Sequence, residues 1–168
     1  MRLLFLLMLA WTATAASPVS VEEAYRAIPH RQTMFQPAAA QMPAAERAYL
    51  TALFQAVDQA IVAKVNSRRG FTVQHSYAPV KQVWAALRPP TAELQAAQDR
   101  VKAAIVDQIA FLVELERKQT GWDMNHAKVR SASGKLQAAY ADLMRLYPGE
   151  AATNKQAFFD YLCALDFI

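Results

Sequence analysis

Residues 43–70 read PAAERAYLTALFQAVDQAIVAKVNSRRG, and this stretch decides the fold. Apolar side chains recur in it at three- and four-residue steps, namely at Leu50, Phe54, Val57, Ile61 and Val65. Pro43 suits the first turn of a helix, and basic residues followed by Gly70 are typical of a helix C-terminus. The stretch therefore predicts one long amphipathic helix that buries one face against other elements.

The C-terminal half of the chain predicts three more helices. Thr91 is expected to cap a helix that runs to Lys118 and carries an apolar stripe of Leu94, Ala97, Val101, Ile105, Leu112 and Leu115. Asp123 is expected to cap the next helix, which stops at Pro148-Gly149. Thr153 and Gln156 form a capping-box pattern that predicts a shorter last helix with Phe158, Tyr161, Leu162 and Leu165 on its face.

Two short accessory segments complete the prediction. Ser20 to Glu23 reads as a capping box that opens a brief helix to about Ile28. Residues 71–78 show no helical pattern, and Pro79 is expected to open a short helix over 80–87. No segment alternates with a period of two for long enough to predict a strand. We therefore predict an all-α antiparallel helical bundle of three long helices, a shorter C-terminal helix and one or two short accessory helices.

Composition supports a folded chain. Of its 168 residues 54% are hydrophobic and 19% are charged, which excludes disordered and collagen-like classes. Cys163 is the only cysteine, so the chain cannot form an internal disulfide.

The first 15 residues predict a signal peptide. Arg2 supplies the positive start, residues 3–11 form a short apolar run, and Ala13-Thr14-Ala15 offers a cleavage site. We expect cleavage after Ala15, a single helical-bundle domain over 16–168, and a protein of the periplasm or the secreted fraction. The apolar run is about half of the roughly 20 residues that a spanning helix needs, so we expect no transmembrane segment after signal removal.

The difference in helix length predicts a gap in the bundle. The last helix is about half as long as the three long helices, so the fourth corner is only half filled. The N-terminal segment, the helix at 80–87, a ligand or a second subunit has to cover the rest. A cleft between the helices of a bundle is a usual ligand site, and we expect one beside the last helix.

Five side chains are candidates for ligand binding. His75, Tyr77 and Trp84 lie in or beside the connection over 71–90. Trp122 lies in the short connector after Lys118, and His126 lies at the start of the helix that Asp123 is expected to cap. Core packing is the alternative for Trp84. Asp123 and His126 stand three residues apart and form a candidate metal pair, with helix capping as the alternative.

These observations favour a non-catalytic binding protein over an enzyme. The expected partner is a small molecule or a periplasmic protein, and homodimer formation stays open. We predict no cofactor, and a carrier of metal or non-covalent haem, or a small exported enzyme with its site at Asp123 and His126, is the alternative. The net charge of +4 becomes +4 − 1 = +3 without Arg2, too weak a field to indicate nucleic acid. The basic clusters Lys64-Arg68-Arg69 and Lys128-Arg130-Lys135 are interpreted as solvated groups at helix ends.

Overall fold

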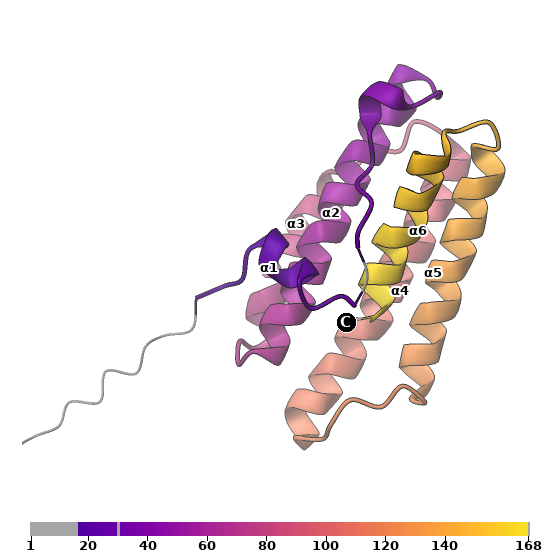
Figure 1. The fold of residues 1–168 in the computed structure, drawn as a ribbon. Helices are drawn as coiled ribbons and strands as arrows, with labels where there is room; N and C mark the ends of the chain where they lie inside the picture. The colour runs from indigo at the N-terminus through magenta and orange to yellow at the C-terminus, as the bar shows by residue number, and fades with distance from the viewer. Residues whose placement is uncertain (1–16, 30, 168) are drawn as a thin grey trace, which may run out of the picture.

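The computed structural model describes residues 17–29 and 31–167, and these residues form the predicted all-α bundle (Figure 1). The predicted signal peptide over 1–15 lies outside the described residues. The described elements are α1 (Val21–Tyr25), the 3-10 helix η1 (Pro37–Ala39), α2 (Ala44–Arg68), α3 (Val73–Ala86), α4 (Ala92–Lys118), α5 (Ala127–Leu146) and α6 (Ala152–Phe167). Among the described helices, none combines the length and the apolar character that crossing a membrane requires.

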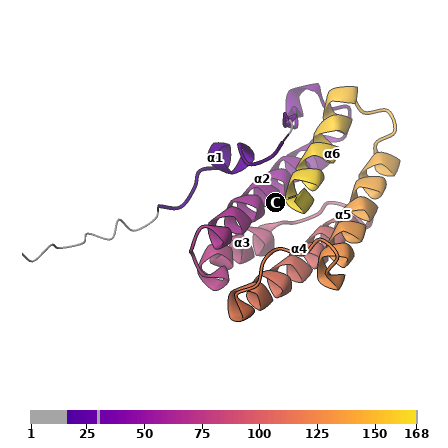
Figure 2. The same cartoon turned by 60° about the horizontal axis from the view of Figure 1, so that its bottom comes forward.

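The helices pack around one apolar core. α4 and α5 form the most extensively packed pair, α3 packs along α2, and α6 lies between α2 and α5 (Figures 1 and 2). Large side chains that are almost fully buried come from five helices and include Phe54, Tyr77, Phe111, Leu143 and Phe158. The amphipathic stripes in the sequence therefore predicted the core-facing sides of the long helices.

Two of the predicted helix caps are confirmed and two are wrong. Ser20 and Glu23 form the capping box of α1, and Thr91 Oγ1 accepts from the Leu94 amide at 3.2 Å at the start of α4. α1 ends at Tyr25, three residues before the end predicted at about Ile28.

The caps of α5 and α6 differ from the prediction. His126 is the N-cap of α5, and its Nδ1 accepts from the Lys128 amide at 3.3 Å, so Asp123 precedes the helix. α6 begins at Ala152, which places Thr153 inside its first turn rather than at the cap. Asp, Ser and Thr side chains in loops form hydrogen bonds in local turns as readily as they cap helices. The same residue pattern therefore occurs without a cap, and the two caps were predicted wrongly.

The connection before α4 is more helical than predicted. α3 is a continuous helix that contains Pro79, although the sequence predicted irregular chain over 71–78 and a helix over 80–87. Thr72 Oγ1 caps it by accepting from the His75 amide at 3.2 Å. Its buried side chains recur at helical spacing and are Val73, Tyr77, Val80 and Trp84. Burial of this stripe on α2 outweighs the backbone hydrogen bond that proline removes.

The N-terminal strap, which we define as residues 17–29 and 31–43, runs beside α2 and α6 (Figures 1 and 2). Three of its amides donate to side chains at or near α6: Thr33 to Asp160 Oδ2 at 2.7 Å, Gln36 to Asn154 Oδ1 at 2.9 Å, and Gln41 to Glu150 Oε2 at 2.9 Å. All three acceptor residues are buried. They satisfy backbone amides of the strap in a partly buried setting.

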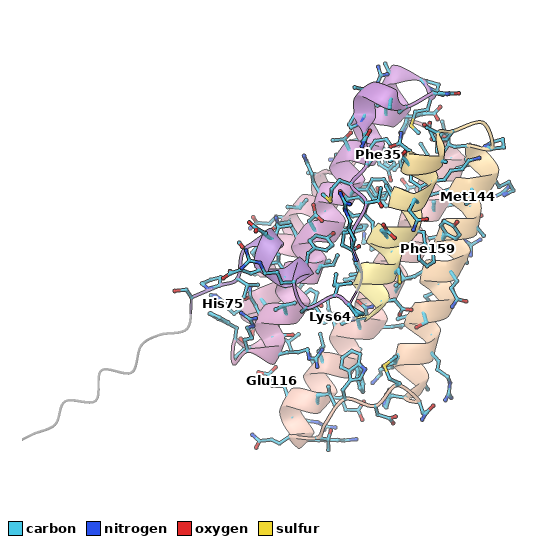
Figure 3. The ribbon with its side chains drawn as sticks, in the orientation of Figure 1. Phe35, Lys64, His75, Glu116, Met144 and Phe159 are labelled. Atoms are coloured by element: carbon cyan, nitrogen blue, oxygen red, sulfur yellow. The ribbon has the colours of Figure 1, made fainter. Side chains whose placement is uncertain are left out.

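Apolar contacts hold the same strap. The Phe35 ring lies 5.5 Å from the Phe54 ring and 6.0 Å from the Phe158 ring, between α2 and α6 (Figure 3). Val19, Ile28 and Met42 are buried as well. Of the coverings expected for the half-filled corner, the structure therefore shows the N-terminal segment in place along α6.

The strap contacts predict a local stability effect. Asn154→Ala removes the acceptor of the Gln36 amide and the donor to the Gln36 carbonyl, which lies 3.3 Å from Asn154 Nδ2. We expect the free energy of unfolding to fall by about 1–3 kcal/mol, because groups of the strap lose their partners in a buried setting. Urea unfolding followed by circular dichroism measures the change.

Thr153→Ala is the matched control, since Thr153 is the exposed neighbour of Asn154. It should change the free energy of unfolding by less than about 0.5 kcal/mol. A loss of about 1 kcal/mol at Thr153 would instead indicate a helix cap there. Equal effects of the two substitutions would contradict the account of the strap.

Candidate functional site

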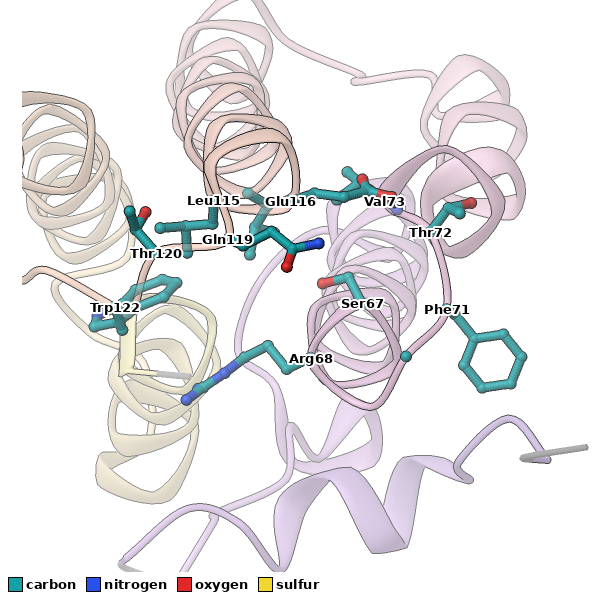
Figure 4. A pocket seen from close by; sticks show the side chains of 12 residues that line it. Ser67, Arg68, Phe71, Thr72, Val73, Leu115, Glu116, Gln119, Thr120 and Trp122 are labelled. Atoms are coloured by element: carbon teal, nitrogen blue, oxygen red, sulfur yellow. Dashed lines mark hydrogen bonds between the residues drawn. The ribbon is translucent and has the colours of Figure 1, made fainter.

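A cleft lies beyond the C-terminal end of α6. α6 has 16 residues, whereas α2 has 25 and α4 has 27, so the long helices continue past it (Figure 1). The cleft has a volume of about 500 Å³ and is lined by residues from 67–73 and 112–122 (Figure 4). We call it the α2–α4 cleft. It sits at the end of the bundle that neither α6 nor the strap covers.

Apolar and polar side chains share the lining of this cleft. Leu112 is buried and Leu115 half-buried, and both come from the last turns of α4. Polar side chains surround them at Ser67, Thr72, Gln119 and Thr120 (Figure 4). An apolar floor with a few polar groups is the usual lining of a small-molecule site.

Two backbone turns form the walls. Gly70 has φ of 100°, a conformation that glycine adopts without strain, and it reverses the chain between α2 and α3. Gln119 has φ of 54° at the end of α4, where its amide donates to the Leu115 carbonyl at 2.7 Å. These left-handed residues stop both helices at the same end of the bundle and leave the space between them open.

Trp122 forms one side of the cleft and contacts two cations. Lys64 Nζ lies 5.1 Å from its ring centroid and Arg68 Cζ lies 5.4 Å from it, within the range of cation–π attraction. Phe111 packs edge-on against the same ring at 4.9 Å. The indole is therefore held by an aromatic core residue on one side and by positive charge on another.

Lys64 is fully buried and secures the end of α6. Its ammonium donates to the Leu165 carbonyl at 3.1 Å and to the Asp166 carbonyl at 3.4 Å, and Gln108 Nε2 also donates to Leu165, at 2.9 Å. A cation at a helix C-terminus is favoured by the helix dipole. The interpretation of Lys64 as a solvated residue is wrong, because the side chain points into the bundle.

Burial also changes the titration of Lys64. Loss of hydration lowers the pKa of its ammonium from 10.5 to about 7, with the Arg68 charge acting in the same direction and Asp166 opposing it. Ser133 Oγ donates to Asp166 Oδ1 at 2.6 Å, so that carboxylate is held toward α5. Lys64 therefore gains and loses its proton close to neutral pH. Among the described residues, no carboxylate forms an ion pair with its ammonium.

Glu116 brings the opposite charge to the other wall of the cleft. Its Oε2 accepts from the Val73 amide at 3.3 Å, at the N-terminal end of α3. Free amides and the helix dipole favour a carboxylate at this position. Glu116 thus has a structural partner, and it joins α4 to α3 across the cleft.

The structure separates the five predicted ligand-binding residues. Trp122 lines the α2–α4 cleft, and His126 packs on the ring of Phe111 at 4.6 Å, behind the cleft wall. His75 is exposed and stacks on Phe71 at 5.7 Å, beside the rim. Tyr77 and Trp84 are buried in the core, where the Trp84 indole donates to the Ala56 carbonyl at 3.2 Å.

Asp123 and His126, the predicted metal pair, take part in local hydrogen bonds. Asp123 Oδ1 accepts from the Asn125 amide at 2.8 Å, and His126 Nδ1 accepts from Lys128. His126 Nε2 lies 3.7 Å from Glu114 Oε2. Over residues 17–29 and 31–167, no group of three or more His, Cys, Asp or Glu side chains is arranged to hold a metal ion.

Sequence reasoning missed the two cations at Trp122, although a signal was present. Lys64 follows Ile61 by three residues, so helical spacing places it on the buried stripe of α2, whereas its charge suggested solvent. Arg68 follows Lys64 by four residues, which puts it on the same side of α2 in the exposed last turn.

A smaller hollow lies beside α6, where the sequence predicted a cleft. It has a volume of about 210 Å³ and lies between α5 and α6, lined by Tyr140, Phe159 and Cys163 among others. Burial raises the pKa of the Cys163 thiol, which keeps it protonated. Its lining is mainly apolar and carries fewer polar groups than the α2–α4 cleft.

Comparison with protein-family models finds no match, and neither a curated protein nor a solved structure matches the chain. Inference about function therefore rests on the geometry of the cleft.

The buried lysine predicts a characteristic pH dependence of stability. Because the pKa of Lys64 lies at about 7 in the folded protein and at 10.5 in its ordinary state, the unfolded chain binds more protons between these pH values. The wild type should therefore gain stability relative to Lys64→Met as the pH rises, by up to about 1.4 kcal/mol per pH unit.

Urea unfolding of both proteins between pH about 7 and about 9 measures this difference. Lys64→Met is nearly isosteric and leaves the hydrogen bond from Gln108 to Leu165 in place. A stability difference that stays constant over this pH range would contradict the lowered pKa of Lys64.

Proposed function

We propose that the chain is an exported, non-catalytic binding protein that holds a small organic molecule in the α2–α4 cleft. The observation that carries this proposal is a cleft of about 500 Å³ with an apolar floor, a polar rim and a tryptophan at its side. This volume and this mixture of groups are those of small-molecule sites in proteins. The proposal of export rests on the signal-peptide pattern of residues 1–15.

Binding fits the cleft better than catalysis does. General acid–base chemistry requires a titratable group that reaches the reacting atoms and has a suitable pKa. Lys64 has such a pKa, but its side chain is fully buried and donates to the carbonyls at the end of α6. Glu116 is likewise engaged, with the Val73 amide. Lys64 and Glu116 thus stabilise the walls of the cleft.

A small ligand also fits the cleft better than a protein partner does. The recess is formed by a loop, a helix end and the side of one indole, and Ser67 and Gln119 point into its limited volume (Figure 4). A protein interface needs a broad contact area of roughly 800 Å² on each partner. The geometry therefore favours an occupant of limited size.

The proposal predicts that an apolar probe binds next to Trp122. We expect the neutral dye N-phenylnaphthylamine to shift the indole N–H resonance of Trp122 in ¹H–¹⁵N spectra of the purified protein. The Trp84 resonance should stay in place, since its indole is buried and bonded to Ala56. Thr120→Phe, which fills the cleft from an exposed position, should weaken dye binding about tenfold or more, the equivalent of about 1.4 kcal/mol.

Ala96→Phe is the control for an added aromatic ring. Ala96 is exposed on α4 and lies outside the cleft lining, so this variant should bind the dye as the wild type does. A dye that leaves Trp122 unchanged, or that binds Thr120→Phe as tightly as the wild type, would reject the α2–α4 cleft as a ligand site.

A further inference from the structure

Arg68 is a cation at the cleft without an acidic partner among the described residues. Its guanidinium is exposed on the last turn of α2 and lies over the Trp122 ring. In the described part of the chain it forms no ion pair and no hydrogen bond. The five N–H groups of an arginine in this state are available to an anionic group with two or more oxygens, such as a carboxylate or a sulfonate.

A second cation supports the same electrostatic preference. Lys64 lies close to the same indole, and its hydrogen bonds go to backbone carbonyls rather than to a carboxylate. Its charge is therefore compensated only in part. The charge of a buried cation is screened less than that of an exposed one, so Lys64 in its protonated form adds to the positive potential beside Arg68.

The acidic groups around the cleft are each held by donors of the protein. Glu116 accepts from the Val73 amide at the start of α3, Asp166 accepts from the Ser133 hydroxyl, and Asp123 accepts from the Asn125 amide. Arg68 has no such partner among the described side chains. These carboxylates keep their charges but have donors, whereas the N–H groups of Arg68 have no acceptor in the described part of the chain.

The remaining lining residues favour a ligand with an apolar organic part. Leu112 and Leu115 supply an apolar floor, and Trp122 offers an aromatic surface next to the guanidinium. An inorganic anion would leave these surfaces exposed to water, whereas an aromatic or aliphatic group would cover them. Charge and apolar surface thus lie side by side in one recess.

Building on the proposed function, we propose that the ligand of the α2–α4 cleft is an organic anion whose charged group pairs with Arg68 while its apolar body packs on Trp122 and the leucines of α4. The anion is recognised by the guanidinium, and Lys64 raises the potential from behind the indole.

Two dyes that differ in one charged group test this inference. Anilinonaphthalenesulfonate carries a sulfonate that N-phenylnaphthylamine lacks, and both are titrated against the purified protein with the Trp122 indole resonance as the site-specific signal. We expect the anionic dye to bind about tenfold more tightly than the neutral dye. Arg68→Gln should remove this preference, as expected for one charge-assisted contact, and should leave the affinity for the neutral dye within about twofold.

Arg69→Gln is the matched control for loss of one positive charge. Arg69 is the exposed neighbour of Arg68 and does not line the cleft, so its substitution should keep most of the preference for the anionic dye. Glu116→Gln retains an acceptor for the Val73 amide and should leave or strengthen the binding of that dye. A weaker affinity in Glu116→Gln would indicate that the site also selects a positive group and would overturn the assignment.

The outcomes separate this inference from the proposed function. If both dyes shift Trp122 with equal affinity, or if Arg68→Gln and Arg69→Gln act alike, the cleft binds small molecules without selecting anions and this inference is wrong. If neither dye shifts Trp122, the proposed function and this inference fall together.

Discussion

The hydrogen bonds from the strap amides to buried side chains at or near α6 are the constraint on which the structure depends. An extended segment has no internal partners for its backbone, so it can be buried only where other groups accept from its amides. Asn154 and Asp160 supply two of those acceptors from α6, and Glu150 supplies the third from the turn before it. They allow residues N-terminal to α2 to complete a bundle whose last helix is too short to complete it alone.

The two ends of α6 have opposite consequences for the bundle. Along its length, the strap covers the groove between α6 and α2, and Phe35 fills the space between their aromatic rings. At its C-terminal end, Lys64 and Gln108 satisfy the last carbonyls and the helix stops. The longer helices α2 and α4 continue beyond this point, and the α2–α4 cleft is the space that remains between them. The cleft is therefore a result of helix length, and the lysine that donates to the last carbonyls of α6 lies beside it.

Local patterns in the sequence predicted the bundle but only part of the candidate site. The apolar stripes, Gly70 and the Thr91 cap were readable because helix periodicity and capping act over a few residues. The length of the last helix predicted an uncovered space and a cleft. The partners of the strap could not be predicted, since Thr33 and Asp160 are 127 positions apart in the chain. The burial of Lys64 could not be predicted from its charge, which favours solvent, although its position continues the apolar stripe of α2. The full length of α3 could not be predicted from Pro79, which favours a helix start, although the apolar spacing continues on both sides of it.

Native-state hydrogen exchange of the strap amides tests the central claim most directly. If buried side chains of α6 hold the strap in place, the amides of Thr33, Gln36 and Gln41 should exchange about as slowly as interior amides of α6, because the two segments open together. Exchange of these three amides at the rate of an unstructured chain, while α6 stays protected, would contradict the account. It would show that the α2–α6 groove is open and that the α2–α4 cleft is not the principal gap in the bundle.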